Sequence, residues 1–251
     1  MMLAGEGGSL KFCVMQKMSQ YLLALFRLFY PRNCAQCGWD LYQHEEGICM
    51  RCLHALPHTL MMLNHLQMKK IFFGRCSWEE QWVFLKMEKS GPVRDALHSL
   101  KYRHQPQVGA ALGKWWAQKI EWQYGRPNWD VMITVPLTPE KKRKRGYNQC
   151  DCIARPMSEH WNIPLVQDVL MKRKGSKSQT LKSRILRNTT EQNPFEVVDP
   201  ERWEGKHILL LDDVVTTGAT LEQCYRALVQ IKNVQLSVAA LAIPVHNRLV
   251  I

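Results

Sequence analysis

The segment from residue 207 to residue 228 constrains the fold more than any other part of this 251-residue chain. An apolar run, His207-Ile-Leu-Leu-Leu211, has the composition of a buried strand, and two acids, Asp212 and Asp213, come directly after it. A short loop rich in hydroxyl groups then leads into an amphipathic helix that we expect to begin at Thr220. This succession is typical of a parallel α/β sheet, in which ligands bind at the carboxyl ends of the strands.

The rest of the chain supports the same class, because apolar runs alternate with helical patterns after about residue 80. Pro92, placed after Ser90-Gly91, is a typical helix start. The patterns predict helices over 92–102, 108–122 and 147–160 and from 220, and strands over 82–85, 130–135, 165–166, 195–198, 207–211 and 234–243. Strands separated by helices predict a parallel sheet with right-handed crossovers.

The loop after the two acids has the residues that a phosphate site needs. Its threonine hydroxyls, its backbone N–H groups and the start of the next helix can surround one anion. The two carboxylates before it accept hydrogen bonds only, which suits a pair of sugar hydroxyls. The alternative is an ordinary strand-to-helix turn with one capping threonine. That alternative does not account for two adjacent acids followed by the loop residues Thr216, Thr217, Gly218, Ala219 and Thr220.

Four of the nine cysteines form two CxxC pairs separated by eleven residues: Cys34, Cys37, Cys49 and Cys52. No export signal is evident, so we expect the chain to lie in a reducing cytoplasm, where such pairs bind metal more often than they form disulfides. Two facing turns of this kind supply a tetrahedral sulfur site for zinc. A closed four-sulfur site leaves no open position for catalysis, so we expect the zinc to be structural.

Three histidines, His44, His54 and His58, lie close enough in sequence to replace one of these cysteines as a ligand. The remaining cysteines lack such pairing and are expected to be buried thiols.

The first 30 residues read as a glycine-rich tail followed by an amphipathic helix. The most apolar stretch, residues 21–30, is about half as long as a membrane-spanning helix and contains Arg27. A signal peptide is not expected either, since Pro31 and the cysteine pairs follow where a small-residue cleavage site would stand. We therefore expect no membrane insertion.

The charge of the chain is strongly uneven. Lys and Arg number 34 against 22 acids, and residues 141–190 alone hold 13 basic residues and three acids. One interpretation of the block Lys141–Arg145 is a solvated loop. The other is an anionic partner, either a pyrophosphate group or single-stranded DNA, whose phosphates attract any such surface. Exposed aromatic residues can stack on bases, although tryptophans are more often buried; the candidates are Trp39, Tyr42, Trp115, Trp116 and Trp161.

The 212–220 segment resembles the phosphoribosyl pyrophosphate (PRPP) loop of type I phosphoribosyltransferases. The chain from about Cys34 onward resembles, more closely still, the ComF/GntX family of competence-associated proteins. Five features carry this resemblance: the four cysteines, Leu100-Lys101-Tyr102, Val135-Pro136-Leu137, Arg145-Gly146-Tyr147-Asn148-Gln149, and a segment with Gln179-Thr180-Leu181, Arg184, Asn188 and Phe195. Two positions depart from the family pattern: Thr134 stands in place of a common proline, and Tyr147 in place of phenylalanine.

The resemblance implies three parts: a tail and helix over 1–30, a zinc ribbon over 31–63, and a phosphoribosyltransferase-like domain over 64–251. It implies that Asp212 and Asp213 face the ribose hydroxyls and that residues 216–220 hold the 5′-phosphate. It also implies Mg²⁺ bound together with PRPP, and Arg145 near the pyrophosphate. A loop that contacts pyrophosphate or DNA would contain Arg173, Lys177, Gln179 and Arg184.

The implied activity is transfer of a phosphoribosyl group, with release of pyrophosphate, to an acceptor that the sequence does not identify. The alternative is a non-catalytic protein of the transformation machinery that binds single-stranded DNA and uses the PRPP pocket as a sensor. Either version implies proteins of DNA uptake as partners. A regulator based on the zinc ribbon alone would leave most of the chain unexplained.

Overall fold

The computed structural model describes residues 32–59, 62–172 and 193–245. Its helices are α2 (Met50–Ala55), α3 (Leu66–Phe72), α4 (Pro92–Tyr102), α5 (Pro106–Tyr124), α6 (Pro139–Arg145), α7 (Gln149–Trp161), the 3₁₀ turn η1 (Pro200–Trp203) and α8 (Ala219–Leu228). Its strands are β1 (Gln81–Met87), β2 (Val131–Thr134), β3 (Leu165–Val166), β4 (Leu170–Lys172), β5 (Phe195–Val197), β6 (His207–Val214) and β7 (Gln235–Pro244).

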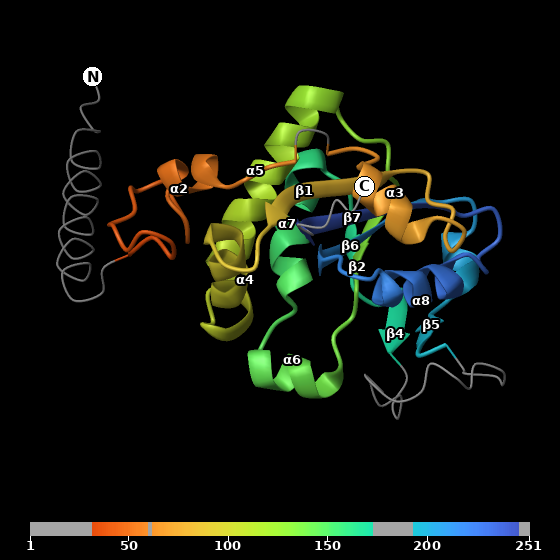
Figure 1. The fold of residues 1–251 in the computed structure, drawn as a ribbon. Coiled ribbons are helices and arrows are strands. Elements are labelled where there is room, and N and C mark those ends of the chain that lie inside the picture. The colour runs from red at the N-terminus through yellow and green to blue at the C-terminus, as the bar shows by residue number, and fades with distance from the viewer. Residues whose placement is uncertain (1–31, 60–61, 173–192, 246–251) are drawn as a thin grey trace, which may run out of the picture.

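Five strands form a parallel sheet in the order β1-β7-β6-β2-β3, so β6 lies at its centre. Strands β4 and β5 form a separate antiparallel pair. The central strands are apolar on both sides because helices cover both faces of the sheet (Figure 1). The predicted α/β class and parallel sheet are confirmed.

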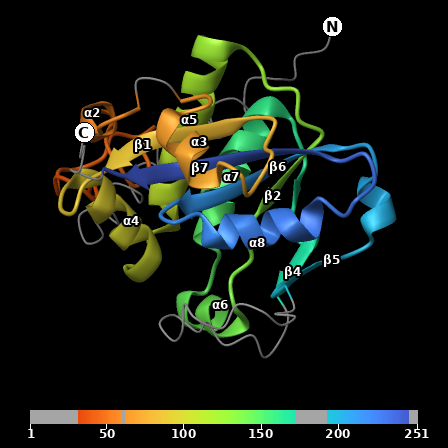
Figure 2. The same cartoon turned by 45° about the vertical axis from the view of Figure 1, so that its right-hand side comes forward.

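Alternate residues of β6 point into two different cores. Leu209 and Leu211 pack in a cluster that contains buried residues of α4, α5 and α7, whereas Ile208 and Leu210 pack in a second cluster with residues of α3 and α8. Figure 2 shows α8 and α3 in front of the sheet, with α7 and α5 behind it. The carboxyl ends of β6 and β2 lie side by side, since Thr134 pairs with Leu211.

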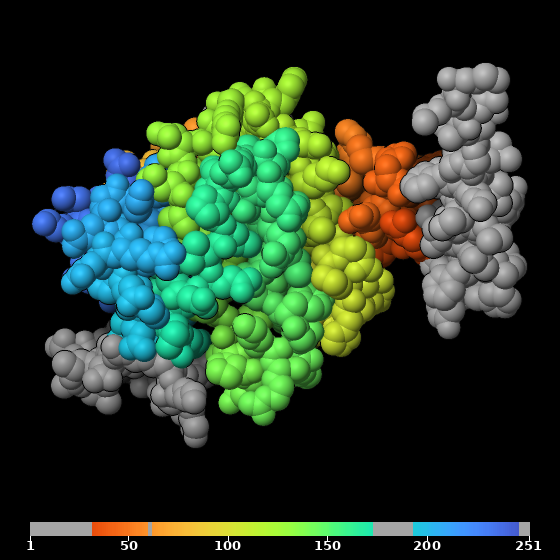
Figure 3. All heavy atoms as spheres, turned by 180° about the vertical axis from the view of Figure 1, so that it is seen from behind, coloured from red at the N-terminus to blue at the C-terminus, as the bar shows by residue number. Residues whose placement is uncertain are grey.

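The cysteine-containing segment packs against α5. Gly47 adopts φ +67°, and a Cβ there would lie 2.6 Å from the backbone of Gln107 and of Val108, so no larger residue fits. Ile48 and Leu53 join the same core as α5 and α7. Figure 3 shows this segment, in orange, beside the helices that cover the back of the sheet.

Three expectations differ from the structure. The basic block at 141–145 is a helix and not a loop, because Thr138 Oγ1 caps it by accepting from Lys141 N at 3.3 Å and Pro139 fixes its first turn. Strand β6 continues through both acids, because its pairing with β7 extends to Val214. Helix α3 is an element that the sequence patterns did not predict.

Four predicted site residues lie outside the described residues: Arg173, Lys177, Gln179 and Arg184. The predicted tail and helix over 1–30 lie outside them as well. Within the described ranges, no helix combines the length and the apolar character that a membrane span requires.

Candidate functional site

The two acids lie at the end of the central strand, where the structure brings several polar groups together. Asp213 is buried and Asp212 is half-buried. Each carboxylate accepts a hydrogen bond from the next backbone N–H, at 2.8 Å for Asp212 Oδ1 and 3.0 Å for Asp213 Oδ1. These bonds fix the two side chains at the edge of the sheet, as the sequence predicts.

Asp213 forms an ion pair that the sequence does not reveal. Its Oδ2 atom contacts Nζ of Lys101, which lies in the last turn of α4. The exposed fractions of these side chains are 8% for Asp213 and 23% for Lys101, so the pair is largely shielded from water. A buried carboxylate without a cationic partner would be strongly disfavoured. Lys101 therefore supplies the cationic partner that a buried Asp213 requires.

Asp212 lies in a less favourable environment for a charge. Burial, followed by the nearby Asp213 carboxylate, raises the pKa of Asp212 to about 7. The Cys150 thiol donates to Asp212 Oδ1 over 3.6 Å, and burial raises the pKa of that thiol well above its usual value. Among the described residues no hydrogen bond to Asp212 Oδ2 is found. This oxygen is thus available to a ligand that can donate a hydrogen bond.

The hydroxyl-rich loop forms a small open cradle directly after the acids. A cavity of about 40 Å³ is lined by Asp212 and by residues from Val214 to Leu221, which include all five loop residues predicted to hold a phosphate. Thr216, Thr217 and Thr220 are exposed. Gly218 is the N-cap of α8 and offers no capping side chain, and Thr217 Oγ1 accepts only a long bond of 3.4 Å from Ala219 N. The first N–H groups of α8 can therefore serve an anion.

The cradle is held in place from the side of α3. Gly218 has φ +75°, and a Cβ there would lie 2.6 Å from Ile71 Cγ2 and 2.7 Å from Phe72 Cε1. The Arg75 guanidinium donates to the Thr217 carbonyl oxygen at 3.2 Å and to Glu222 Oε2 at 2.9 Å. Only glycine fits at 218, and Arg75 connects the loop to the first turn of α8.

The end of β2 lies beside β6 and is bonded to α7. Thr134 Oγ1 donates to Asp151 Oδ1, and Asn148 Nδ2 donates to the Val135 carbonyl oxygen at 3.1 Å. Asn148 also caps α7, since its side chain accepts from Cys150 N at 3.1 Å. A proline in place of Thr134 could not make the bond to Asp151. Thr134, which stands where the family pattern has a proline, thus provides a hydrogen bond to α7 that the more rigid proline would lack.

Arg145 lies at the end of α6 and points along α7. Its guanidinium donates to Gln149 Oε1 and lies 5.7 Å from the centre of the Tyr102 ring. It lines neither of the cavities described here, so its predicted contact with pyrophosphate stays a prediction. The Tyr147 hydroxyl donates to the Leu100 carbonyl oxygen, a bond that a phenylalanine at this position could not make.

A larger pocket opens beside the cradle, and we call it the α4 pocket. It has a volume of about 610 Å³ and lies between α4 and the ends of β1, β6 and β7. Asp213 lines it, and Val214 and Thr216 line both this pocket and the cradle. The two cavities therefore adjoin at the end of β6.

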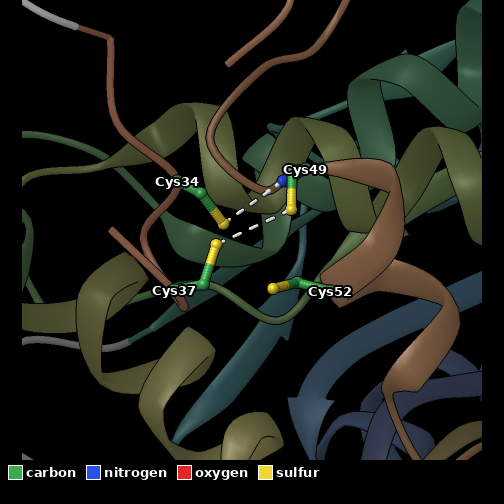
Figure 4. A group of neighbouring side chains, drawn as sticks. All are labelled: Cys34, Cys37, Cys49 and Cys52. Atoms are coloured by element: carbon green, nitrogen blue, oxygen red, sulfur yellow. Dashed lines mark hydrogen bonds between the residues drawn. The ribbon is translucent and has the colours of Figure 1, made fainter. Parts of the chain in front are cut away.

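The four paired cysteines converge as their spacing predicts (Figure 4). Their sulfur atoms all lie within 4.8 Å of one another, and Cys37 Sγ lies 3.8 Å from Cys49 Sγ. Tetrahedral zinc with bonds of about 2.3 Å requires sulfur atoms about 3.8 Å apart. The cluster can therefore hold a structural metal. His58 packs against Trp115 instead, at 4.9 Å between ring centres, and is not part of the cluster.

The surroundings of Cys34 lower the pKa of its thiol. Burial opposes its charge, but the backbone N–H groups of Cys37, Cys49 and Gln36 outweigh that effect and lower the pKa of Cys34 to about 7. Zinc binds the thiolate, so the lowered pKa favours ligation by Cys34 in particular, whereas burial raises the pKa values of Cys49 and Cys52.

Of the aromatic residues considered for base stacking, Trp115, Trp116 and Trp161 are buried core residues. Trp39 and Tyr42 are each 73% exposed and lie next to the cysteine cluster. No role in the site was predicted for Lys101, Arg75 or Asp151. Lys101 belongs to a motif that it shares with the ComF/GntX family, but its partner is 112 positions away, which no local pattern reveals.

Comparison with known proteins finds relatives over most of the chain. The chain is 24% identical over 213 residues to DNA utilization protein YhgH of Salmonella typhi, a match that covers 81% of this chain and 93% of that protein. It is 23% identical over 214 residues to competence protein F of Haemophilus influenzae, covering 80% and 92%. It is 28% identical over 142 residues to competence protein ComFC of Bacillus subtilis, covering 55% and 54%.

No family model matches the chain. Solved structures that resemble it include the glutamine PRPP amidotransferase of B. subtilis with ADP and GMP, at 19% identity and a TM-score of 0.39, covering 57% of this chain and 30% of that one. An adenine phosphoribosyltransferase matches at 13% identity and a TM-score of 0.38, covering 58% and 74%. The strand order given above, and not this degree of likeness, establishes the α/β arrangement.

Proposed function

We propose that this chain, a homologue of the competence proteins of the ComF/GntX family, binds PRPP at the carboxyl end of β6. The observation that carries the proposal is the open cradle of residues 216–220, which follows the two acids and ends at the start of α8, where the N-cap Gly218 offers no capping side chain. The cradle takes the 5′-phosphate, and Asp212 and Asp213 accept hydrogen bonds from the ribose hydroxyls.

The donor groups fit a magnesium ion that arrives with its substrate. Mg²⁺ keeps several waters and binds through one or two carboxylates together with substrate phosphates. Asp212 Oδ2 is available at the site, and the Lys101 ammonium already balances the charge of Asp213. When bound, the ion would neutralise the pyrophosphate. The chain itself would orient the sugar and exclude alternative positions of the phosphate.

The reaction that this arrangement supports is phosphoribosyl transfer. A lone pair of the acceptor forms a bond to C1′ while the bond from C1′ to the pyrophosphate oxygen breaks, and both electrons of that bond leave with pyrophosphate. The proton of the acceptor passes to water. No protein nucleophile is required, because catalysis by positioning and by charge neutralisation suffices for a reaction of this type.

Calorimetric titration with PRPP and Mg²⁺ tests the proposal. We expect binding to the native chain and its loss in the variant Asp212→Asn/Asp213→Asn. Asp168→Asn is the matched control, because Asp168 is an exposed acid that lines neither cavity. Equal affinity of the native chain and the double variant would refute the pocket, and so would a native chain that does not bind PRPP.

We further infer that the cysteine cluster binds structural zinc and thereby orders the segment that packs on α5. The convergence of the four sulfur atoms supports this role. Because all four positions of the metal would be filled by protein, the zinc would contribute to stability and not to the reaction.

A second candidate function, binding of single-stranded DNA in uptake or processing, is favoured by α6. This helix carries five basic residues and one acid, and Lys141, Lys142, Arg143 and Lys144 are all exposed. Figure 3 shows α6, in bright green, projecting at the bottom of the molecule, where phosphates can reach it. If this is the sole function, the PRPP site acts as a sensor, and the competence machinery supplies the partners.

Filter binding at several salt concentrations tests the second candidate. We expect the affinity for single-stranded DNA to fall steeply with salt, and the slope to become shallower when the four exposed residues of α6 are replaced by glutamine. A flat salt response, or an unchanged slope in the variant, would exclude α6 as the contact.

A further inference from the structure

The α4 pocket has the size and position of a second substrate site. Its volume of about 610 Å³ falls within the range of about 300–1,000 Å³ that is usual for small-molecule sites. It shares Val214 and Thr216 with the cradle and is lined by Asp213. A sugar held by the acids, with its phosphate in the cradle, would therefore lie at the border between the two cavities.

The walls of the α4 pocket suit a flat ring. Leu97, Val214 and Pro244 supply apolar surface. His98 and Tyr102 stand one turn apart on α4, with their ring centres 5.0 Å apart. Tyr102 is 61% exposed, so part of its ring is accessible to a ligand even though the Arg145 guanidinium lies 5.7 Å from the ring centre. Aromatic ligands gain both apolar burial and ring contacts on such a surface.

The charges of the α4 pocket favour an anion. Lys89, Arg94 and Lys101 line it, against the two acids Glu88 and Asp213. Asp213 is already engaged by Lys101. Arg94 is held in place because its guanidinium donates to the Lys89 carbonyl oxygen, which leaves its other N–H groups for a ligand. The cations that line the α4 pocket thus outnumber its acids by three to two, and apolar residues line it as well.

We propose that the α4 pocket receives the phosphoribosyl acceptor, and that this acceptor is a flat aromatic ring with an anionic substituent. This inference rests on the proposed binding of PRPP, and it adds the chemical class of the second substrate. The ring lies against Leu97 and Tyr102, and Arg94 and Lys89 contact the anionic group. A nucleophilic ring atom then faces C1′ of the sugar across Asp213.

Matched pairs of probes that differ only in charge test the inference. Ligand-observed NMR titration in the presence of Mg²⁺ and PRPP compares pyridine-3-carboxylate with pyridine-3-carboxamide, and phenyl phosphate with phenol. We expect the charged member of at least one pair to bind about tenfold more tightly, which is typical of one charge-assisted hydrogen bond. The pair that shows the preference distinguishes a carboxylate from a phosphate source.

Variants of α4 locate the binding. Arg94→Gln removes a cation that lines the pocket, and Arg103→Gln removes an exposed cation that follows the same helix but does not line it. We expect the charge preference to vanish in the first variant and to persist in the second. Lys89→Gln serves the same purpose if Arg94→Gln fails to fold.

The outcomes separate this inference from the proposed function. If PRPP binds but neither probe pair shows a charge preference, or if Arg94→Gln and Lys89→Gln both retain it, the inference is wrong and the PRPP site stands. If the charged probes bind in the α4 pocket but PRPP does not bind at the cradle, the acceptor role is overturned together with the proposed function.

Discussion

Lys101 and Asp213 join α4 to the central strand at the edge where the cradle and the α4 pocket meet. The ammonium group neutralises one of the two acids and leaves the other, Asp212, with a raised pKa. The site therefore holds one acid paired with a cation and one acid, Asp212, whose pKa burial raises to about 7. Two adjacent aspartates in water would not differ from each other in this way.

Removing the cation should destabilise the fold. Lys101→Met leaves the buried Asp213 carboxylate without its ion-pair partner, so we expect the free energy of unfolding to fall by about 3 kcal/mol. The double variant Lys101→Met/Asp213→Asn removes both charges and should recover much of that loss. Urea denaturation of the four proteins of this cycle measures the coupling. Additive losses would show that the two residues do not interact.

Asp212 should make stability depend on pH. Its folded pKa is about 7, above the unfolded value of 3.8, so the folded state binds more protons between these values. The free energy of unfolding should therefore fall as pH rises from about 4 to about 7, by up to about 1.4 kcal/mol per unit. Urea denaturation at several pH values should give a shallower slope for Asp212→Asn than for Asp168→Asn. Identical slopes in the two variants would contradict the raised pKa.

Gly218 should be irreplaceable in the cradle. Gly218→Ala combines an unfavourable φ of +75° with Cβ contacts of 2.6 and 2.7 Å to α3. We expect a loss of about 2–4 kcal/mol in stability and weaker PRPP binding. Gly205→Ala is the control, because Gly205 has φ +66° and open space around it, so that only the backbone effect of about 1 kcal/mol remains. Equal losses in the two variants would show that α3 does not confine the loop.

The purified chain should contain about one zinc ion, measured by elemental analysis. Cys52→Ser should abolish retention of the metal, whereas Cys76→Ser should leave it unchanged, since Cys76 lies outside the cluster. A native chain without metal, or a Cys52→Ser variant that retains it, would show that the cysteine cluster does not bind zinc.

Local patterns in the sequence predicted the elements that local rules govern. Helix α4 begins and ends where Pro92 and the apolar spacing place it, and the cysteine spacing alone indicated the metal cluster. The basic block at 141–145 suggested a solvated loop, whereas the structure forms a helix there that Thr138 caps. A charged surface and a short helix are compatible, because none of the residues of α6 is buried.

The contacts between distant segments could not be predicted in this way. The ion pair between Lys101 and Asp213 depends on how α4 packs against β6, and the extension of β6 through the acids depends on its pairing with β7. The α4 pocket is likewise lined by the ends of β1, β6 and β7 together with α4. Each requires the register of the sheet, which a single sequence does not specify.

The bond from the Tyr147 hydroxyl to the Leu100 carbonyl oxygen has a mechanical consequence. Tyr147 immediately precedes the N-cap of α7, and Leu100 immediately precedes Lys101, so the bond fastens the entry of one helix to the exit of another. A displacement of Lys101 toward a bound anion would therefore also move Tyr147 and the start of α7. We expect the end of α4 and the start of α7 to move together, and not independently, when a ligand binds.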